Sequence, residues 1–341
     1  MTHNKERLVQ FDLIRVIAML FVIMIHVPDH PFENIPLLEN AAMTVLLLCN
    51  PFFYLISGRF NLNKTFETKQ DYRQFYRKKA VTVLIPFVFA TFALCGASLI
   101  SKREFSPLYY LQYTYRFFMN ENNDSHLWFL YPLMGFLLAT PFLSKMLHAM
   151  QLWELKLLLI IGLAWNTLSI YLTADIGVGF AFSGWILSGY IIYYVGGYLL
   201  MNFPADKMKK VLYPAGLAGF VITIIGKTYF AEHFYSSTSV SPAFVLFGFA
   251  AYIFIENEVK IRGKWFPELL SRIVPLSFWV YLFHMAVLNH IVMRFTAFGP
   301  VWLRFASRFL LTILISLALG FVLDTVLMKP LKKVLLRSDR S

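Results

Sequence analysis

Charged residues and cysteines are both scarce in this chain. Asp, Glu, Lys and Arg make up only 15% of its 341 residues, whereas soluble domains usually carry about a quarter. The two cysteines, Cys49 and Cys95, lie in apolar stretches, so the sequence implies no disulfide framework. With 58% hydrophobic residues and a mean hydropathy of +0.60, the composition excludes an ordinary soluble domain.

The sequence also lacks the motifs of metal, nucleotide and serine-hydrolase sites. No set of His, Cys and carboxylate residues has the spacing of a metal site, so we predict no metal. There is no Gly-rich phosphate loop, and no Gly-x-Ser-x-Gly elbow surrounds Ser57. The dipeptide Ser57-Gly58 therefore fits close helix packing better than it fits a nucleophile.

What the chain has instead is a series of long apolar runs. Runs of this length are typical of transmembrane helices, not of the short alternating strands of a barrel. We therefore predict an all-α, polytopic integral membrane protein that forms a single domain over residues 1–341, without a soluble extracytoplasmic domain. The first run contains Asp12 and Arg15 and has no cleavage site, so it is not a signal peptide. About ten spans are predicted, at residues 10–28, 41–60, 76–100, 127–147, 153–173, 182–202, 211–231, 240–257, 272–295 and 302–328.

Basic residues are distributed unevenly between the two sides of these spans. If both termini are cytoplasmic, 23 of the 31 Lys and Arg residues face the cytoplasm, 7 face outward and Arg15 lies within the membrane. The positive-inside rule favours this orientation. The bias also accounts for the net charge of +12 through loops beside an anionic leaflet. We therefore predict the lipid bilayer, and no nucleic acid, as a partner.

The first span carries three ionisable residues. Ionisable groups within a membrane span are costly and usually functional. Asp12 and Arg15 are three residues apart, and Arg15 and His26 are eleven apart, which is three helical turns plus about 20°. The sequence therefore places an ion pair and an imidazole on one helix face. Because the span runs outward, Arg15 lies in its cytoplasmic half and His26 near its outer end.

Six segments, in order along the chain, resemble the acyltransferase family 3 membrane proteins. The first, FDLIRVIAMLFVIMIHV at 11–27, contains the family hallmark of an Arg and a His separated by ten residues. The resemblance covers nearly the whole chain. The other segments are PFFYLISGRF at 51–60, FYRKKAVTVLIPF at 75–87, HLWFLYPLMGFLLATPFL at 126–143, YYVGGYLL at 193–200 and PLSFWVYLFHMAVL at 275–288.

The resemblance implies a membrane enzyme that transfers acyl groups, commonly acetyl, to carbohydrates of the cell envelope. It implies a multi-pass protein of the bacterial cytoplasmic (inner) membrane, of the compact type that acetylates common antigen or capsule. The usual donor is cytoplasmic acetyl-CoA, and the acceptor is a lipid-linked or exported glycan. One departure concerns the family's Arg-x-x-Arg pair, because alignment on Pro86 places Lys79 and Thr82 at those positions.

His26 is the leading candidate for the catalytic group. A neutral imidazole can accept the proton of a sugar hydroxyl as the hydroxyl attacks a thioester, or it can carry the acyl group covalently. Arg15 and His26 would mark the route of the acyl group through the bundle, and Asp12, which pairs with Arg15, is a further candidate site residue. His284, in the middle of a later span, is a candidate second acid/base group.

Other residues are candidates for binding the two substrates. The aromatic ring of Trp128 could stack on a sugar, and His126 lies beside it at the predicted outer interface. A basic cluster on the predicted inner face suits the anionic donor, because phosphates favour Arg and Lys. This cluster consists of Arg73, Arg77, Lys78 and Lys79.

Each of these residues also has a structural interpretation. The Asp12–Arg15 pair could simply anchor the first helix, and His284 could bind a neighbouring helix. His126 could be an interface anchor, and the basic cluster could reflect only the positive-inside rule. Ten spans with buried charge also suit a transporter or exporter, which would show paired broken helices in two halves. The oligomeric state stays open.

Overall fold

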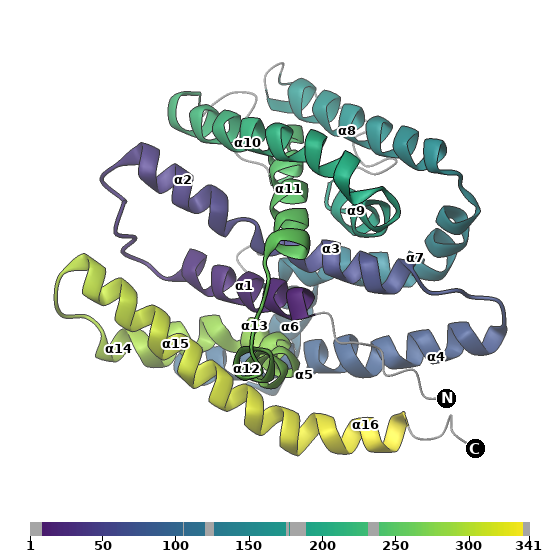
Figure 1. Cartoon of the computed structure of the whole chain (residues 1–341). Coiled ribbons are helices and arrows are strands. Elements are labelled where there is room, and N and C mark those ends of the chain that lie inside the picture. The colour runs from purple at the N-terminus through teal and green to yellow at the C-terminus, as the bar shows by residue number, and fades with distance from the viewer. Residues whose placement is uncertain are drawn as a thin grey trace. The chain divides into compact units, whose positions relative to one another are not determined.

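The computed structural model describes residues 9–104, 106–119, 126–174, 177, 189–230 and 239–336. All regular elements in these ranges are helical, which confirms the all-α prediction (Figure 1). Among the described residues, eight helices are long and apolar enough to cross a membrane, so the chain has the character of a multi-pass membrane protein in a lipid bilayer. They are Val9–His26, Pro36–Leu62, Lys69–Ser101, His126–Ala149, Leu152–Leu172, Ala205–Tyr229, Trp265–Phe295 and Val301–Leu335.

Two of the ten predicted spans have shorter counterparts in the structure. For the span predicted at 182–202, residues 182–188 lie outside the described ranges, and the described helix is α9 (Ile191–Asn202), of 12 residues. A helix of that length rises about 18 Å, well short of the ~30 Å hydrocarbon core. The span predicted at 240–257 corresponds to α11 (Pro242–Glu258), of 17 residues. The count of ten and the cytoplasmic placement of both termini therefore stay predictions.

The chain divides into two compact units, and each is described by itself. Unit 1 comprises residues 1–65 and 140–275, and unit 2 comprises residues 66–139 and 276–341. The long helix α7 (Leu130–Ala149) begins in the segment assigned to unit 2 and ends in that of unit 1.

Besides α9, α11 and the end of α7, the described part of unit 1 contains six α-helices. Its first helix, α1, packs against α2, α3, α11 and α12 (Figure 1). The six helices are α1 (Val9–His26), α2 (Pro36–Leu46), α3 (Cys49–Leu62), α8 (Leu152–Ala174), α10 (Ala205–Tyr229) and α12 (Trp265–Ile273).

Small residues allow the helices of unit 1 to approach closely. A Cβ on Gly58 of α3 would collide with the carbonyl of Tyr194 in α9, and a Cβ on Gly197 would collide with the carbonyl of Leu55. These glycines belong to two of the segments that carry the family resemblance, and they interlock α3 with α9. The structure thus supports the interpretation of Ser57-Gly58 as a packing site. Small residues at helix interfaces are the usual device for such packing in membranes.

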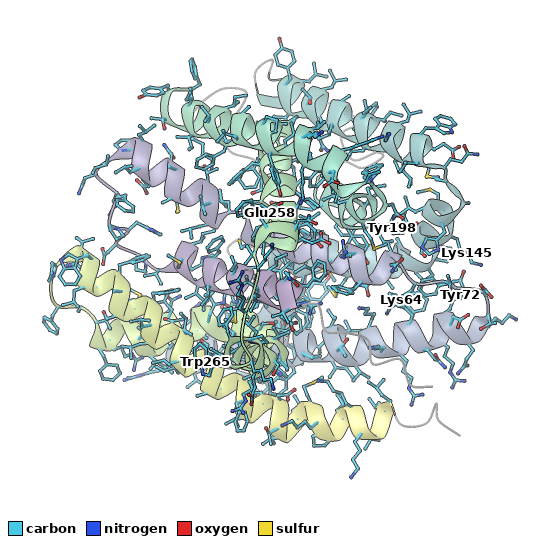
Figure 2. The ribbon with its side chains drawn as sticks, viewed as in Figure 1. Lys64, Tyr72, Lys145, Tyr198, Glu258 and Trp265 are labelled. Atoms are coloured by element: carbon cyan, nitrogen blue, oxygen red, sulfur yellow. The ribbon has the colours of Figure 1, made fainter. Side chains whose placement is uncertain are left out.

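The helices α10 and α11 are joined in a similar way and by a polar link. Gly216 of α10 lies against Ala250 of α11, where a Cβ would not fit. At the end of α11, the carboxylate of Glu258 lies 2.7 Å from Lys209 Nζ and accepts a hydrogen bond from the Tyr213 hydroxyl at 3.1 Å. Figure 2 labels Glu258 at this end of the helix. The polar link therefore holds the end of α11 against the start of α10.

Unit 2 contains the long interrupted helix formed by α4, η1 and α5, the helix α13, and the C-terminal helices α15 and α16. The buried helix α13 packs against α5 and α15. The α-helices are α4 (Lys69–Lys79), α5 (Ile85–Ser101), α6 (Pro107–Phe118), α13 (Ser277–Val287), α14 (Met293–Phe295), α15 (Val301–Leu323) and α16 (Lys329–Leu335), together with the start of α7. The 3₁₀ segment η2 (His126–Phe129) precedes α7, and η3 (Val274–Leu276) precedes α13.

Within the described residues of unit 2, three π-helical turns interrupt these helices: η1 (Ala80–Leu84), η4 (Leu288–Val292) and η5 (Asp324–Met328). Two of them end two residues before a proline: η1 ends at Leu84 before Pro86, and η5 ends at Met328 before Pro330. A proline ring clashes with the carbonyl four residues earlier in a regular α-helix, and a widened turn relieves the clash.

The N-terminus of α4 is capped, because the Thr68 side chain and the Asp71 side chain form a capping box.

Candidate functional site

The polar face predicted for the first span is present on α1. The helix is continuous from Val9 to His26, so Arg15 and His26 lie about 16 Å apart along one helix. Arg15 Nη1 lies 3.3 Å from Asp12 Oδ1, which confirms the predicted ion pair. The Asp12 side chain is almost fully buried and that of Arg15 is 31% exposed. His26 is half-buried and ends the helix.

A second ion pair lies in the same unit, between α3 and α11. Arg59 Nη2 lies 2.8 Å from Glu256 Oε1, and both side chains are mostly buried. This pair was not predicted, because Arg59, at the end of the predicted span 41–60, was counted with the basic residues of the cytoplasmic side. A carboxylate inside the apolar run 240–257 was the available signal.

Aromatic rings connect the two ion pairs. The Arg59 guanidinium lies over the Phe11 ring at 4.5 Å from its centre, and the Arg15 guanidinium lies over the Phe60 ring at 5.2 Å. The two rings meet edge to face at 5.3 Å. Each guanidinium thus has a carboxylate and an aromatic face, arrangements that stabilise buried arginine. We call Asp12, Arg15, Arg59 and Glu256 the four-charge cluster.

The opposite face of α1 is apolar. Ile17 and Phe21 lie roughly half a turn away from Arg15 and His26, and they line a groove of about 560 Å³ with residues of α10 and α11. The helix therefore separates its ionisable residues from a hydrocarbon surface.

In unit 2, the structure brings two of the predicted histidines together. The rings of His126 and His284 meet edge to face, with centres 5.0 Å apart. Tyr281 joins them, because its hydroxyl donates to the His126 carbonyl at 2.6 Å and its carbonyl lies 2.8 Å from His284 Nδ1. His284 is completely buried, and His126 is half-buried.

The hydrogen bonds of this pair define its tautomers. A carbonyl oxygen can only accept, so His284 Nδ1 donates to Tyr281 and His126 Nε2 donates to the Leu282 carbonyl at 3.0 Å. In a neutral ring the other nitrogen then carries the lone pair, which is Nε2 of His284 and Nδ1 of His126. Each imidazole therefore has one basic nitrogen that can accept a proton from a hydroxyl group.

The remaining predicted binding residues also lie in unit 2. Trp128 is half-buried in η2, two residues after His126. The basic cluster occupies one helix, α4, where Arg73 and Lys78 are exposed and Arg77 and Lys79 are half-buried. Lys79 Nζ lies 5.5 Å from the centre of the Phe75 ring. Four cations on one short helix form a surface that attracts phosphate groups.

The predicted site residues therefore form two groups, one in each unit. Asp12, Arg15 and His26 share α1 of unit 1, whereas the histidine pair, Trp128 and the basic cluster belong to unit 2. Within the described ranges, no group of three His, Cys, Asp or Glu residues could hold a metal ion. Each group contains a histidine that can act as a general base and cations that can bind an anion, and acyl transfer to a hydroxyl uses both kinds of residue.

Comparison with known proteins identifies the family. The family model described as "Acyltransferase domain", that of acyltransferase family 3, matches residues 8–321. This range contains both groups of site residues. No curated protein and no solved structure matches the chain. Because the family model covers nearly the whole sequence, the chain belongs to acyltransferase family 3 and is an acyltransferase.

Proposed function

We propose that the protein transfers an acetyl group from cytoplasmic acetyl-CoA to a hydroxyl of an envelope or surface glycan in the bacterial inner membrane. The observation that carries this proposal is the ionisable face of α1, on which a buried ion pair and a half-buried histidine share one helix. Buried ionisable groups in a membrane helix are retained for function far more often than for packing. Family membership favours an enzyme over the transporter alternative.

In this reaction, the sugar oxygen attacks the thioester carbonyl, the C–S bond breaks, and the thiolate leaves as coenzyme A. The hydroxyl proton must be removed as the new C–O bond forms, and it can then pass to the thiolate. His26 would accept that proton or carry the acetyl group transiently. A positioned base contributes about 10²–10⁴-fold to such a step.

The other predicted residues have supporting roles in the same reaction. Asp12 holds Arg15, whose guanidinium would orient the donor. His284, with its basic Nε2, would be the second acid/base group. His126 and Trp128 would contact the acceptor, with the indole stacking on a sugar ring. Arg73, Arg77, Lys78 and Lys79 would attract the phosphates of coenzyme A.

The test uses the purified chain in proteoliposomes and a strain that lacks the gene. Proteoliposomes given acetyl-CoA and surface glycan should release free coenzyme A thiol only when both substrates are present. Mass spectrometry and NMR of glycans from the deletion strain should show a missing acetyl group. A normal glycan acetylation pattern, with solute uptake into the proteoliposomes, would instead support the transporter alternative.

A further inference from the structure

A groove on unit 2 lies between the first part of α7 and the long helix formed by α4, η1 and α5. Its volume is about 310 Å³. A cavity of about 150 Å³ is enough to bind a benzene molecule, so this groove has room for a segment of a hydrocarbon chain. Eight residues line it: Tyr76, Lys79, Ala80, Val83, Leu84, Met134, Leu137 and Leu138.

The π-turn η1 forms one wall of this groove. Three of its five residues line the groove, and two of these, Ala80 and Val83, have small side chains. The Tyr76 hydroxyl donates a hydrogen bond to the Leu138 carbonyl at 2.8 Å, which ties α4 to α7 at the groove. Leu84 and Leu138 are exposed, so the groove opens to the surroundings of the helices and not into the core. A π-turn of this kind is often found at a functional site.

Lys79 lies at the end of the groove that faces the membrane boundary. Residues 80–101 contain no charged side chain, and a helix of that length is sufficient to cross the hydrocarbon core. Lys79 therefore marks the point at which this helix enters the hydrocarbon. A half-buried lysine can place its stem along apolar surface and its ammonium group at the boundary. The groove thus has its cationic end at the level of lipid headgroups and its apolar part at the level of acyl chains.

The charges at this end of the groove favour an anionic ligand. Arg77 and Lys78 directly precede Lys79, and the described residues that line the groove include no carboxylate. Asp71, the acidic residue of α4, is two turns away and caps the start of the helix. Basic clusters at the membrane end of a helix attract anionic lipids, whereas the cationic group of a zwitterionic headgroup would be repelled.

We propose that this groove binds an anionic phospholipid, with one acyl chain along η1 and the phosphate at Lys79. A soluble nucleotide does not suit the groove, because only Tyr76 and Lys79 of its lining have polar side-chain groups, and the Tyr76 hydroxyl already donates to Leu138. The inference does not depend on the proposed function. A bound acyl chain would contact α4, η1 and α7 together, and so hold these helices in place where the basic cluster meets the membrane.

The test is native mass spectrometry of the full-length chain, which counts bound lipids and subunits in one measurement. The probes are phosphatidylglycerol and phosphatidylcholine with identical acyl chains, added to lipid-free protein in detergent. Val83→Phe fills the groove, and its matched control is Val322→Phe, at an exposed position of α15. Lys79→Gln removes the cation, and its control is Lys102→Gln, at the other end of the same uncharged stretch. A thermal melt of each variant confirms that it is folded.

We expect the wild type to bind phosphatidylglycerol more tightly than phosphatidylcholine. Lys79→Gln should weaken phosphatidylglycerol binding about fivefold, the contribution of one basic residue at an anionic surface, and leave phosphatidylcholine binding unchanged. Val83→Phe should weaken phosphatidylglycerol binding about tenfold, because part of the acyl chain loses its buried contacts. Both control variants should bind the two lipids as the wild type does.

Three results would overturn the proposal. The first is equal binding of the two lipids by the wild type, and the second is an equal effect of Lys79→Gln and Lys102→Gln, which would indicate general attraction of charge. The third is normal phosphatidylglycerol binding by folded Val83→Phe, which would place the lipid elsewhere. A lipid-free dimer of the wild type that Val83→Phe converts to a monomer would instead assign the groove to a second copy of the chain. If Val83→Phe does not fold, the comparison of Lys79→Gln with Lys102→Gln decides.

Discussion

The Arg59 guanidinium lies 4.5 Å from the centre of the Phe11 ring, and this contact joins α3 to the helix that carries Asp12, Arg15 and His26. Phe11 is almost completely buried, and it is one residue from Asp12. A change at Arg59 therefore acts on the start of α1 as well as on its own ion pair. The first ionisable residues of the helix depend on residues far away in the sequence.

His26→Ala should abolish acetyl transfer while the melting temperature in detergent stays close to that of the wild type. The imidazole is half-buried at the end of α1, so its removal opens little of the core, whereas a base or acyl carrier has no substitute there. The matched control is His290→Ala, which removes an exposed histidine. Near-normal transfer by His26→Ala at equal protein level would remove His26 from the mechanism.

Arg15→Lys should reduce transfer even though the positive charge is retained. The planar guanidinium contacts Asp12 and stacks on Phe60, and an ammonium group reproduces neither geometry. Activity and melting temperature are measured on the same preparation. Wild-type activity in Arg15→Lys would show that charge alone matters at this position.

His284→Asn should lower transfer by about 10²-fold or more with little change in melting temperature. Asparagine keeps an N–H near the position of Nδ1, which donates to Tyr281, but it has no basic nitrogen in place of Nε2. His290→Asn is again the exposed control. A parallel loss of activity and melting temperature would instead assign His284 to helix packing.

Neutralising the basic cluster on α4 should raise the donor KM more than it lowers the rate at saturating donor. The charges would contribute mainly to binding of the donor's phosphates, which is the same in ground and transition states. The variant replaces all four residues by Gln: Arg73, Arg77, Lys78 and Lys79. Replacing Lys102 and Arg103, at the other end of α5, serves as the control. An unchanged donor KM with normal membrane insertion would place the donor elsewhere.

Gly58→Ala should destabilise the protein by about 1–3 kcal/mol, because the new methyl group meets the Tyr194 carbonyl and must push α3 away from α9. Gly135→Ala is the matched control, since that glycine has nothing within 4 Å of an added Cβ. Its replacement should leave the stability equal or slightly higher, as expected for a helical glycine. Equal melting temperatures for the two variants would contradict the close packing.

The sequence was sufficient for the features that depend on one helix. Apolar runs predicted most of the long helices, and residue spacing predicted the Asp12–Arg15 pair on α1, because these depend only on local periodicity. The short α9 was not predicted, because its apolar character continues into residues 182–188, which lie outside the described ranges. Hydropathy measures composition, and a run of apolar residues does not say where a helix starts.

Contacts between helices distant in sequence were beyond the sequence analysis. Nothing in the spacing of His126 and His284 indicates that their rings meet, and the Arg59–Glu256 pair depends on how α3 and α11 pack. One such contact did leave a signal. Gly58 and Gly197 each occur in a family-like segment, and a small residue in an apolar helix is a sign of close approach.

The π-helical turns before Pro86 and Pro330 are positions at which a helix of unit 2 can lose one residue and remain continuous. A π-turn holds one residue more than a regular turn, and each residue corresponds to about 100° of rotation. Because the widened turn takes up this extra residue as a local bulge, deleting one residue from η1 would restore a regular helix and leave the cationic side of α4 close to its present direction relative to α5. The same deletion within the regular helix α5 would instead turn the two flanking parts of the helix by about 100° relative to each other.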